Sequence, residues 1–210
     1  MDKSTKLALE NGEMLPLMEA FYSIQGEGFF AGTAAYFLRI GGCDVGCHWC
    51  DVKESWDSTL HPPTLVTDIL KDIKKYNVDT VVITGGEPLM WNLDNLTNLL
   101  KVNNYKTHLE TSGTHPLSGS FDWICFSPKK MQSPLNDIKF FANELKVIVS
   151  NKHDLIWAKK QCIGINNKCK LYLQPEWSKK DIVLPMIIEF VQENKEWCIS
   201  LQSHKYMNIP

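Results

Sequence analysis

The chain has 210 residues, which is enough for one domain with a sizeable apolar core. Its 22 basic and 24 acidic residues give a formal net charge of −2, and no basic stripe is present, so the composition argues against nucleic acid as a partner. Charges are scattered through residues 1–15, and no run of about 18 apolar residues occurs, which argues against a signal peptide and a membrane span. We therefore expect a cytoplasmic protein whose cysteines are reduced.

Short runs rich in β-branched and aromatic residues alternate with segments of helical periodicity along most of the chain. The runs predict strands at 34–40, 80–86, 106–112, 123–128, 144–150, 170–175 and 197–202. Apolar residues at helical spacing predict helices at 64–76, 93–102, 152–162 and 179–194. This alternation predicts an α/β fold with a parallel sheet, and the absence of repeats and linkers predicts a single domain.

Polar residues or glycines follow the apolar part of four predicted strands. They lie at 84–87, 110–113, 127–129 and 174–175. Each group alone is explained equally well by a turn. Because the carboxyl ends of parallel strands share one edge of a sheet, we expect the four groups to meet in one ligand pocket.

Three cysteines, Cys43, Cys47 and Cys50, are crowded into the stretch GGCDVGCHWCD at 41–51. In a reducing compartment this spacing points to metal or redox chemistry rather than disulfides. A zinc site needs four ligands, and no second pair of ligands follows, although His48 is a candidate for the fourth. Three thiolates also suit a cubane iron–sulfur cluster with one open iron, which can bind a small molecule through an amine and a carboxylate.

The other four cysteines stand alone at wide separations. We interpret them as small apolar residues, buried or half-buried, with no part in a cluster. They are Cys125, Cys162, Cys169 and Cys198.

The motif Cys43-x3-Cys47-x2-Cys50, with Trp49 before the last cysteine, resembles the cluster signature of the radical S-adenosylmethionine (SAM) superfamily. TGGEP at 84–88 resembles the glycine-rich strand end that holds the methionine amino group of SAM in that superfamily. Further segments, in order, resemble the 7-carboxy-7-deazaguanine synthase family from about residue 20 onward. They are FYSIQGEGFFAG, VVITGGEP, HLETSGT, SPK and LQSHKYMNIP.

The resemblance implies an incomplete (β/α) barrel of about six parallel strands, made by a single radical SAM domain over 1–210. An N-terminal substrate-binding segment and a cluster loop at 41–52 belong to it. The implied reaction converts 6-carboxy-5,6,7,8-tetrahydropterin to 7-carboxy-7-deazaguanine and ammonia on the route to queuosine-type 7-deazapurines. The implied cofactors are a 4Fe–4S cluster, SAM and Mg²⁺, and the implied partners are a flavodoxin or ferredoxin and a second copy of the chain.

The resemblance also assigns site residues. Cys43, Cys47 and Cys50 correspond to the cluster ligands, and the reactive species comes from the cofactor, so no catalytic side chain is expected. For Ser127 and Lys129 a solvated turn is the alternative. The residues expected to bind SAM are Gly86, Glu110, Ser112, Ser127, Pro128, Lys129, Gln174, Pro175, Glu176 and Trp177.

Arg39 is expected to hold the substrate carboxylate with its planar guanidinium, although a surface salt bridge is the alternative. Gln25 offers both a donor and an acceptor to a pterin edge, with Glu27 as a weaker candidate. His204 is either a substrate contact or a structural histidine. The residues expected to bind substrate are Ile24, Gln25, Gly26, Arg39, Thr84 and, through a terminal carboxylate, Pro210.

One position departs from the family pattern. The resemblance places a magnesium-ligating threonine two residues after the third cysteine, where this chain has Val52, which offers no oxygen. We therefore expect a weak or altered magnesium site.

Other functions fit parts of the pattern. An activase of glycyl-radical enzymes shares the cysteine spacing, and a non-catalytic iron–sulfur electron carrier or a zinc-binding module would need only the cysteines. A SAM cleavage assay separates the enzymes from the binding proteins.

Overall fold

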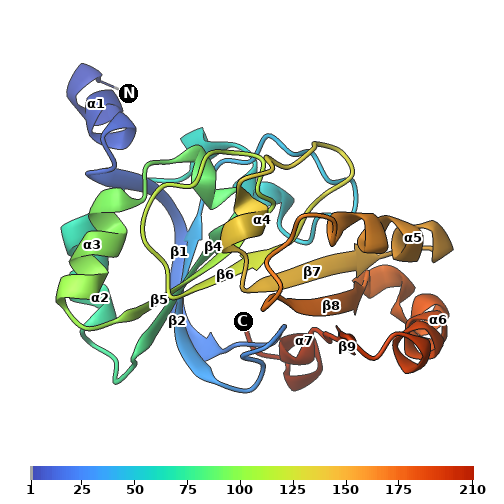
Figure 1. Ribbon diagram of the computed structural model, residues 1–210. Helices are drawn as coiled ribbons and strands as arrows, with labels where there is room; N and C mark the ends of the chain where they lie inside the picture. Colours follow the sequence, from blue (N-terminus) through green and yellow to red (C-terminus); the bar gives the residue numbers. More distant parts are fainter. Residues whose placement is uncertain (1) are drawn as a thin grey trace.

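The computed structural model describes residues 2–210. One sheet of nine strands runs through the molecule in the order β3-β1-β2-β4-β5-β6-β7-β8-β9 (Figure 1). The strands from β2 to β9 pair in parallel, whereas β1 pairs antiparallel with both β2 and β3. Within the described residues β3 and β9 are unpaired edges, so the sheet is an open, incomplete barrel, as expected.

The seven parallel strands lie where the sequence predicts strands. They exceed the expected number of about six because the short β9 also joins the sheet. They are β2 (Ala34–Ile40), β4 (Thr80–Gly85), β5 (Lys106–Thr111), β6 (Trp123–Phe126), β7 (Glu144–Val149), β8 (Lys170–Pro175) and β9 (Trp197–Ile199).

Two strands and a helix near the N-terminus were not predicted. They are α1 (Lys3–Glu10), β1 (Met14–Ile24) and β3 (Pro63–Leu65). The sequence of β1 contains Pro16, and its register with β2 shifts between Leu17 and Glu19. A proline and a bulge both interrupt the strict alternation by which a strand is recognised.

The four predicted helices form, and each is shorter than its predicted segment, the first by five residues and the others by one or two. They are α2 (Val66–Ile73), α3 (Asp94–Val102), α5 (Lys152–Gln161) and α6 (Lys180–Glu193), and the short helices α4 (Ile138–Phe141) and α7 (Ser203–Met207) add to them. In α2 the buried side chains are Val66, Ile69, Leu70 and Ile73, which share one face at helical spacing. Among residues 2–210, no helix combines the length and apolar character that crossing a membrane requires.

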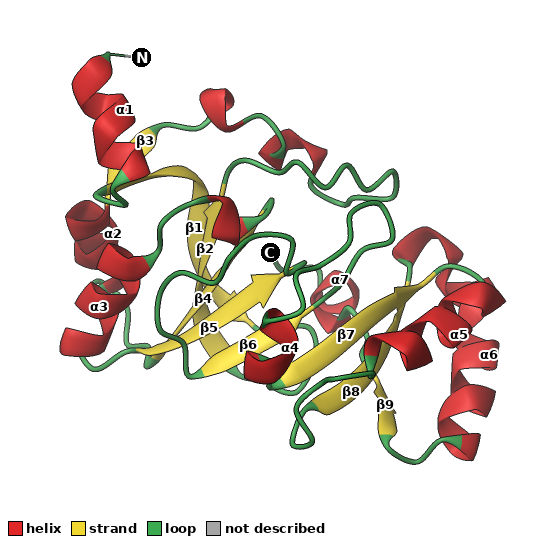
Figure 2. Ribbon diagram, turned by 45° about the horizontal axis from the view of Figure 1, so that its top comes forward, coloured by secondary structure: helices red, strands yellow, loops and turns green. Residues whose placement is uncertain are grey.

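The helices cover one face of the sheet. Helices α2 and α3 lie beside its first half and α5 and α6 beside β7 to β9, as Figures 1 and 2 show. The core between them contains fully buried Leu38, Ile83, Leu109 and Leu173 from four parallel strands. The turn after β1 meets the start of α7, where the amide of Ser203 donates to the carbonyl of Gly26 at 2.9 Å. This contact lies on the side of the sheet away from helices α2, α3, α5 and α6, and Gly26 lines a cavity on that side.

Candidate active site

Two adjoining cavities lie at the carboxyl ends of the parallel strands. One, of about 230 Å³, is lined by all three clustered cysteines and is here named the cysteine cavity. The other, of about 320 Å³, is lined by Arg39 and is named the arginine cavity. The residues that line both cavities form a common wall. They are Glu27, Asp51, Thr84, Glu110 and Gln202.

The cluster loop after β2 places the three cysteines. Cys47 is buried, Cys43 and Cys50 are half-buried, and burial raises the pKa of the Cys43 and Cys47 thiols. No three His, Cys, Asp or Glu side chains within residues 2–210 gather around a single ion. A cubane is larger than an ion and binds each thiolate through a different iron, so its ligands stand further apart. His48 is exposed and does not line the cavity, so the structure does not place it as a fourth ligand.

Glycines at the end of β4 let the cluster loop approach the sheet. A Cβ on Gly86 would lie 2.3 Å from the carbonyl oxygen of Gly42 and 2.8 Å from the Cβ of Cys43. Gly85 has a φ of +141°, and a Cβ there would lie 2.1 Å from the Ile40 carbonyl oxygen. A larger residue at Gly86 would move the cysteine loop, and one at Gly85 would move the end of β2.

Glu87 joins the ends of β4 and β5, a role that the sequence did not indicate. Its carboxylate is 1% exposed and accepts from the hydroxyl of Thr111 at 2.6 Å. It also accepts from the amide and hydroxyl of Ser112 at 2.7 and 2.5 Å. A buried carboxylate with this many donors is well satisfied, and it fixes the strand ends that line the cysteine cavity.

The opposite side of the cysteine cavity carries the Lys129 ammonium. Lys129 donates to the carbonyl and hydroxyl of Ser127 at 2.5 and 2.7 Å. Burial lowers the pKa of Lys129, and the nearby Cys47 sulfur opposes that shift only in part. The half-buried Trp56 also lines the cavity, and its indole N–H is the one buried side-chain nitrogen or oxygen without a partner in the described part of the chain. Such a donor calls for a ligand acceptor.

The arginine cavity is closed by the segment 202–210 against the loop after β1. A Cβ on Gly26 would lie 2.2 Å from Nδ1 of His204, so glycine permits this approach. Burial lowers the pKa of His204. Gln25 is buried, and its side-chain oxygen accepts from the amide of Glu27 at 3.1 Å. The cavity therefore combines an amide, an imidazole and the Arg39 guanidinium, which suits a polar molecule.

Comparisons with known proteins agree with this geometry. A family model described as the radical SAM superfamily matches residues 38–125. A 7-carboxy-7-deazaguanine synthase from Flavobacterium psychrophilum is 55% identical and covers 100% of both chains. One from Synechocystis is 45% identical over 92% of this chain and 93% of that one. The crystal structure of QueE from Escherichia coli has a TM-score of 0.84 at 31% identity, covering 97% of this chain and 100% of that chain.

The chain belongs to the 7-carboxy-7-deazaguanine synthase family. It is a radical SAM enzyme of queuosine-type biosynthesis, and its cofactors are a 4Fe–4S cluster and SAM. The cysteine cavity fits them, because three cysteines without a fourth ligand line it together with Trp56, whose buried indole N–H has no protein partner in the described residues. Membership of this family sets aside the glycyl-radical activase, the electron carrier and the zinc module.

Nine of the ten residues expected to bind SAM line the cysteine cavity of this family member. The exception is Pro128, which is buried but does not line the cavity. All six residues expected to bind substrate line the arginine cavity, as do Glu27 and His204. Arg39 also pairs with Glu19, so the salt bridge that the sequence offered as an alternative exists beside its place in the cavity.

The isolated cysteines follow the expectation with one exception. Cys125 is buried beside Glu144, and Cys162 and Cys169 pack half-buried against the core. Cys198 is exposed, because its neighbour Trp197 packs against helix α6 and Cys198 therefore lies on the other face of the three-residue edge strand β9.

The residues present do not fit a protein-held magnesium ion of the implied kind. Val52 lines the arginine cavity but has no oxygen, and magnesium takes oxygen ligands in a strict octahedron. The adjacent Asp51 carboxylate accepts from the Lys205 ammonium and from the Gln202 amide, the latter at 3.1 Å. Asp51 is therefore already neutralised by a protein cation.

Proposed function

We propose that this enzyme converts 6-carboxy-5,6,7,8-tetrahydropterin to 7-carboxy-7-deazaguanine with release of ammonia. The observation that carries the proposal is the common wall between the two cavities, because a cofactor in one then lies beside a substrate in the other. When bound, the cluster and SAM supply a 5′-deoxyadenosyl radical that removes a hydrogen atom from the substrate. We also propose that residues 1–210 form a single domain, with the loop after β1 as the substrate-binding segment.

In the cysteine cavity, the side chains bind and orient the cofactors. Cys43, Cys47 and Cys50 would hold the cluster, and with no fourth protein ligand the cluster would keep an open position that could take up SAM. Lys129 supplies positive charge near the SAM carboxylate, and Gly86 allows the backbone to approach its methionine part. Glu110, on the common wall, suits a ribose hydroxyl of SAM.

In the arginine cavity, we assign the carboxylate of the pterin to Arg39. The guanidinium side chain is 21% exposed and lies 5.9 Å from the ring of Phe21, which restricts its orientation. Gln25 and Glu27 then face the amide and amine edge of the pterin. Thr84, on the common wall, contacts the substrate on the side of the cysteine cavity. Pro210 and His204 complete the far side.

The protein needs no nucleophile or general base for this reaction. Its contribution is to orient two ligands and to exclude water and stray hydrogen donors from the space between them. The buried amide of Gln25, the half-buried His204 and the backbone contact from Ser203 to Gly26 close the arginine cavity on the side away from the sheet.

Three further properties belong to this proposal. The electron donor is a flavodoxin or a ferredoxin, which the exposed side of the cluster loop would meet. The active form is a homodimer. Magnesium binds weakly through substrate oxygens and water and stimulates turnover only modestly, since Val52 offers no ligand.

The test is anaerobic reconstitution of the cluster, followed by incubation with SAM, reductant and 6-carboxy-5,6,7,8-tetrahydropterin. We expect mass analysis to detect 7-carboxy-7-deazaguanine, and ammonia to appear in equal amount. Cleavage of SAM without this product, under conditions where the pterin is intact at the start, would refute the proposed substrate while leaving the radical SAM chemistry in place.

A further inference from the structure

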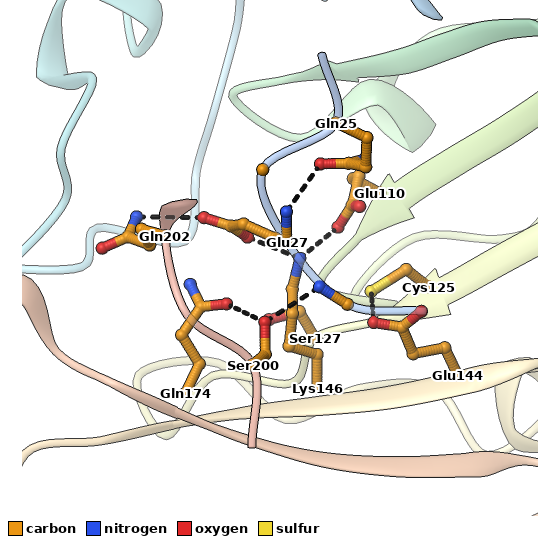
Figure 3. Close-up of polar contacts among 12 residues, drawn as sticks. Gln25, Glu27, Glu110, Cys125, Ser127, Glu144, Lys146, Gln174, Ser200 and Gln202 are labelled. Carbon is orange, nitrogen blue, oxygen red and sulfur yellow. Dashed lines mark hydrogen bonds and ion pairs between the residues drawn. The ribbon is translucent and has the colours of Figure 1, made fainter. Parts of the chain in front are cut away.

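Lys146 of β7 is a buried charged residue at the boundary between the two cavities. It is 3% exposed, and its ammonium lies 2.6 Å from Oε2 of Glu27 and 2.8 Å from Oε2 of Glu110 (Figure 3). Lysine is almost never fully buried unless it is paired. The two carboxylates come from different segments, Glu27 from the loop after β1 and Glu110 from β5. One ammonium therefore joins two parts of the chain that are far apart in sequence.

Both partners of Lys146 belong to the common wall. Glu27 and Glu110 each line the cysteine cavity and the arginine cavity, and Lys146 lines the cysteine cavity. Their side chains remain 19% and 23% exposed, so each can also contact a ligand. Oε2 of Glu110 accepts from Lys146, and the buried thiol of Cys125 lies close to the same carboxylate.

The charges in this group are strongly coupled. Burial opposes the charge on Lys146, but the acidic groups around it hold its pKa well above the ordinary lysine value. Burial likewise opposes the charge on Glu27, yet Lys146 and Gln202 lower the pKa of that carboxyl to about 2. The trio of Lys146, Glu27 and Glu110 keeps one excess negative charge, and the nearby Glu144 and Lys129 add one acidic and one basic group around it.

The loop after β1 is held against the same side of the sheet by further contacts. The amide of Gly28 donates to the hydroxyl of Ser200 at 2.9 Å, and the amide of Phe29 donates to Glu144 at 3.1 Å. Gly28 has a φ of +65°, and a Cβ there would lie 2.0 Å from Oε1 of Glu144. These bonds fix the loop to β7 and to the segment after β9. Among the hydrogen bonds of residues 2–210, the Lys146 pairing is the one that reaches from the loop to Glu110.

We infer that Lys146 is a positioning residue of the reaction, an inference that rests on the proposed function. Its ammonium holds Glu27 on the pterin side and Glu110 on the SAM side at a fixed separation. SAM and the pterin then lie in the relative position that hydrogen transfer requires. Because transfer between two bound molecules is sensitive to displacements of about 1 Å, loss of the bridge should uncouple SAM cleavage from product formation.

The test compares the holoenzyme with Lys146→Met, which keeps an unbranched side chain one atom shorter than lysine and removes its charge. We expect product formation to fall about a hundredfold. Formation of 5′-deoxyadenosine should fall much less, so that the ratio of 5′-deoxyadenosine to product rises at least about tenfold. Lys130→Met is the matched control, since Lys130 also pairs with a buried carboxylate, Asp154, but lines neither cavity. Its ratio should equal that of the unmodified enzyme.

A second readout does not depend on the substrate. The amides of residues 27–29 should exchange their hydrogens about tenfold faster in Lys146→Met than in the unmodified holoenzyme, while the exchange of β4 and β5 stays unchanged. The exchange result also separates the two hypotheses. If the unmodified enzyme makes no deazapurine but the exchange changes as expected, the proposed substrate is wrong and the role of Lys146 in holding the loop survives.

A double variant covers the case in which Lys146→Met fails to fold. Lys146→Met with Glu27→Gln removes one carboxylate together with the lysine and keeps the excess charge of the group at one. We expect this protein to fold and to remain uncoupled, because the bridge is still missing. An unchanged ratio in either variant would overturn the inference. So would loss of product and of 5′-deoxyadenosine in equal proportion, which would show a role in the fold alone.

Discussion

The cysteine cavity and the arginine cavity lie side by side but are built in different ways. The cysteine cavity is lined mainly by the cluster loop and by residues at the carboxyl ends of neighbouring parallel strands. Each of these residues lies at the end of a strand or directly after it in the sequence. The arginine cavity needs the end of β1 and the segment 202–210, which meet through contacts such as that of Ser23 with Pro210 across 187 positions. The chemistry of the first is therefore specified by short motifs, and that of the second by long-range packing.

The cysteines of the cluster loop provide the largest expected effect. Replacing Cys43, Cys47 or Cys50 with alanine should abolish the visible absorption of the cluster and all cleavage of SAM, because all three are assigned to the cluster as ligands. The measurements are iron content, absorption and 5′-deoxyadenosine formation. Alanine at Cys125 or Cys198 should lower stability at most. Loss of the cluster in Cys125→Ala would contradict the assignment of three ligands.

The next effect should be confined to the arginine cavity. Arg39→Ala should lower product formation by roughly two powers of ten or more, since the pterin carboxylate would lose its charged partner, while uncoupled SAM cleavage persists. Glu19→Ala is the control, because it removes the ion pair of Arg39 but leaves the guanidinium in place. Both products are measured by chromatography. An equal loss of both activities in Arg39→Ala would place its role in the fold or in the SAM site.

The sequence predicted most of the cysteine cavity because its residues follow strands or sit in motifs. Thr84, Gly86 and Glu110 are examples, since each lies at the end of a strand with a clear apolar run. Pro128 is predicted to bind SAM together with its neighbours Ser127 and Lys129, but it is buried and does not line the cavity. The parallel strands were predicted for the same reason: several β-branched or aromatic residues in a row identify a buried strand.

Residues whose roles arise from contacts across the fold were missed. Lys146 lies in the run ELKVIV, and nothing in that run shows that two carboxylates from distant segments surround the lysine. Glu87 is predicted only as one of the residues at 84–87 that reach the ligand pocket, and three of its four protein donors come from Thr111 and Ser112 at the end of β5. Trp56 carries no local signal either. Pairing of this kind depends on topology, which single-sequence periodicity does not encode.

A smaller effect concerns magnesium in the arginine cavity. In the unmodified enzyme after chelator treatment, magnesium should stimulate product formation only modestly, and Val52→Thr should increase that stimulation because a fixed hydroxyl replaces a water ligand. Val82→Thr, at another apolar position in the same cavity, is the control and should not respond. Tight, saturating dependence on magnesium that Val52→Thr leaves unchanged would show that the metal's ligands lie elsewhere.

The smallest effect is on stability and concerns His108, which packs under the loop after β1. Its ring centroid lies 4.5 Å from that of Phe30, and burial lowers the pKa of His108 to about 4. The unfolded chain binds a proton near pH 6.5 and the folded chain does not, so the free energy of unfolding should fall as the pH falls from about 6.5 to 4.

His108→Gln should remove about 1 kcal/mol of that dependence, which is less than the full pKa difference implies because solvent screens the partly accessible ring. The measurement is denaturant unfolding of the cluster-free protein at several pH values, compared between the two proteins so that the shared contribution of the carboxylates cancels. A parallel dependence in both proteins would mean that His108 is protonated in the folded chain.

The contact of Gly28 with Ser200, across 172 positions, has a consequence for the order of folding. A contact between such distant residues cannot form until most of the intervening chain is compact, because the entropy lost in closing the loop grows with its length. The parallel strands, joined by short crossovers, can form before it. The arginine cavity should therefore be structured late, after the transition state, and destabilising changes there should mainly accelerate unfolding rather than slow refolding. The unfolding rate of the native protein is then set mainly by the hydrogen bonds between residues 25–29 and residues 200–205.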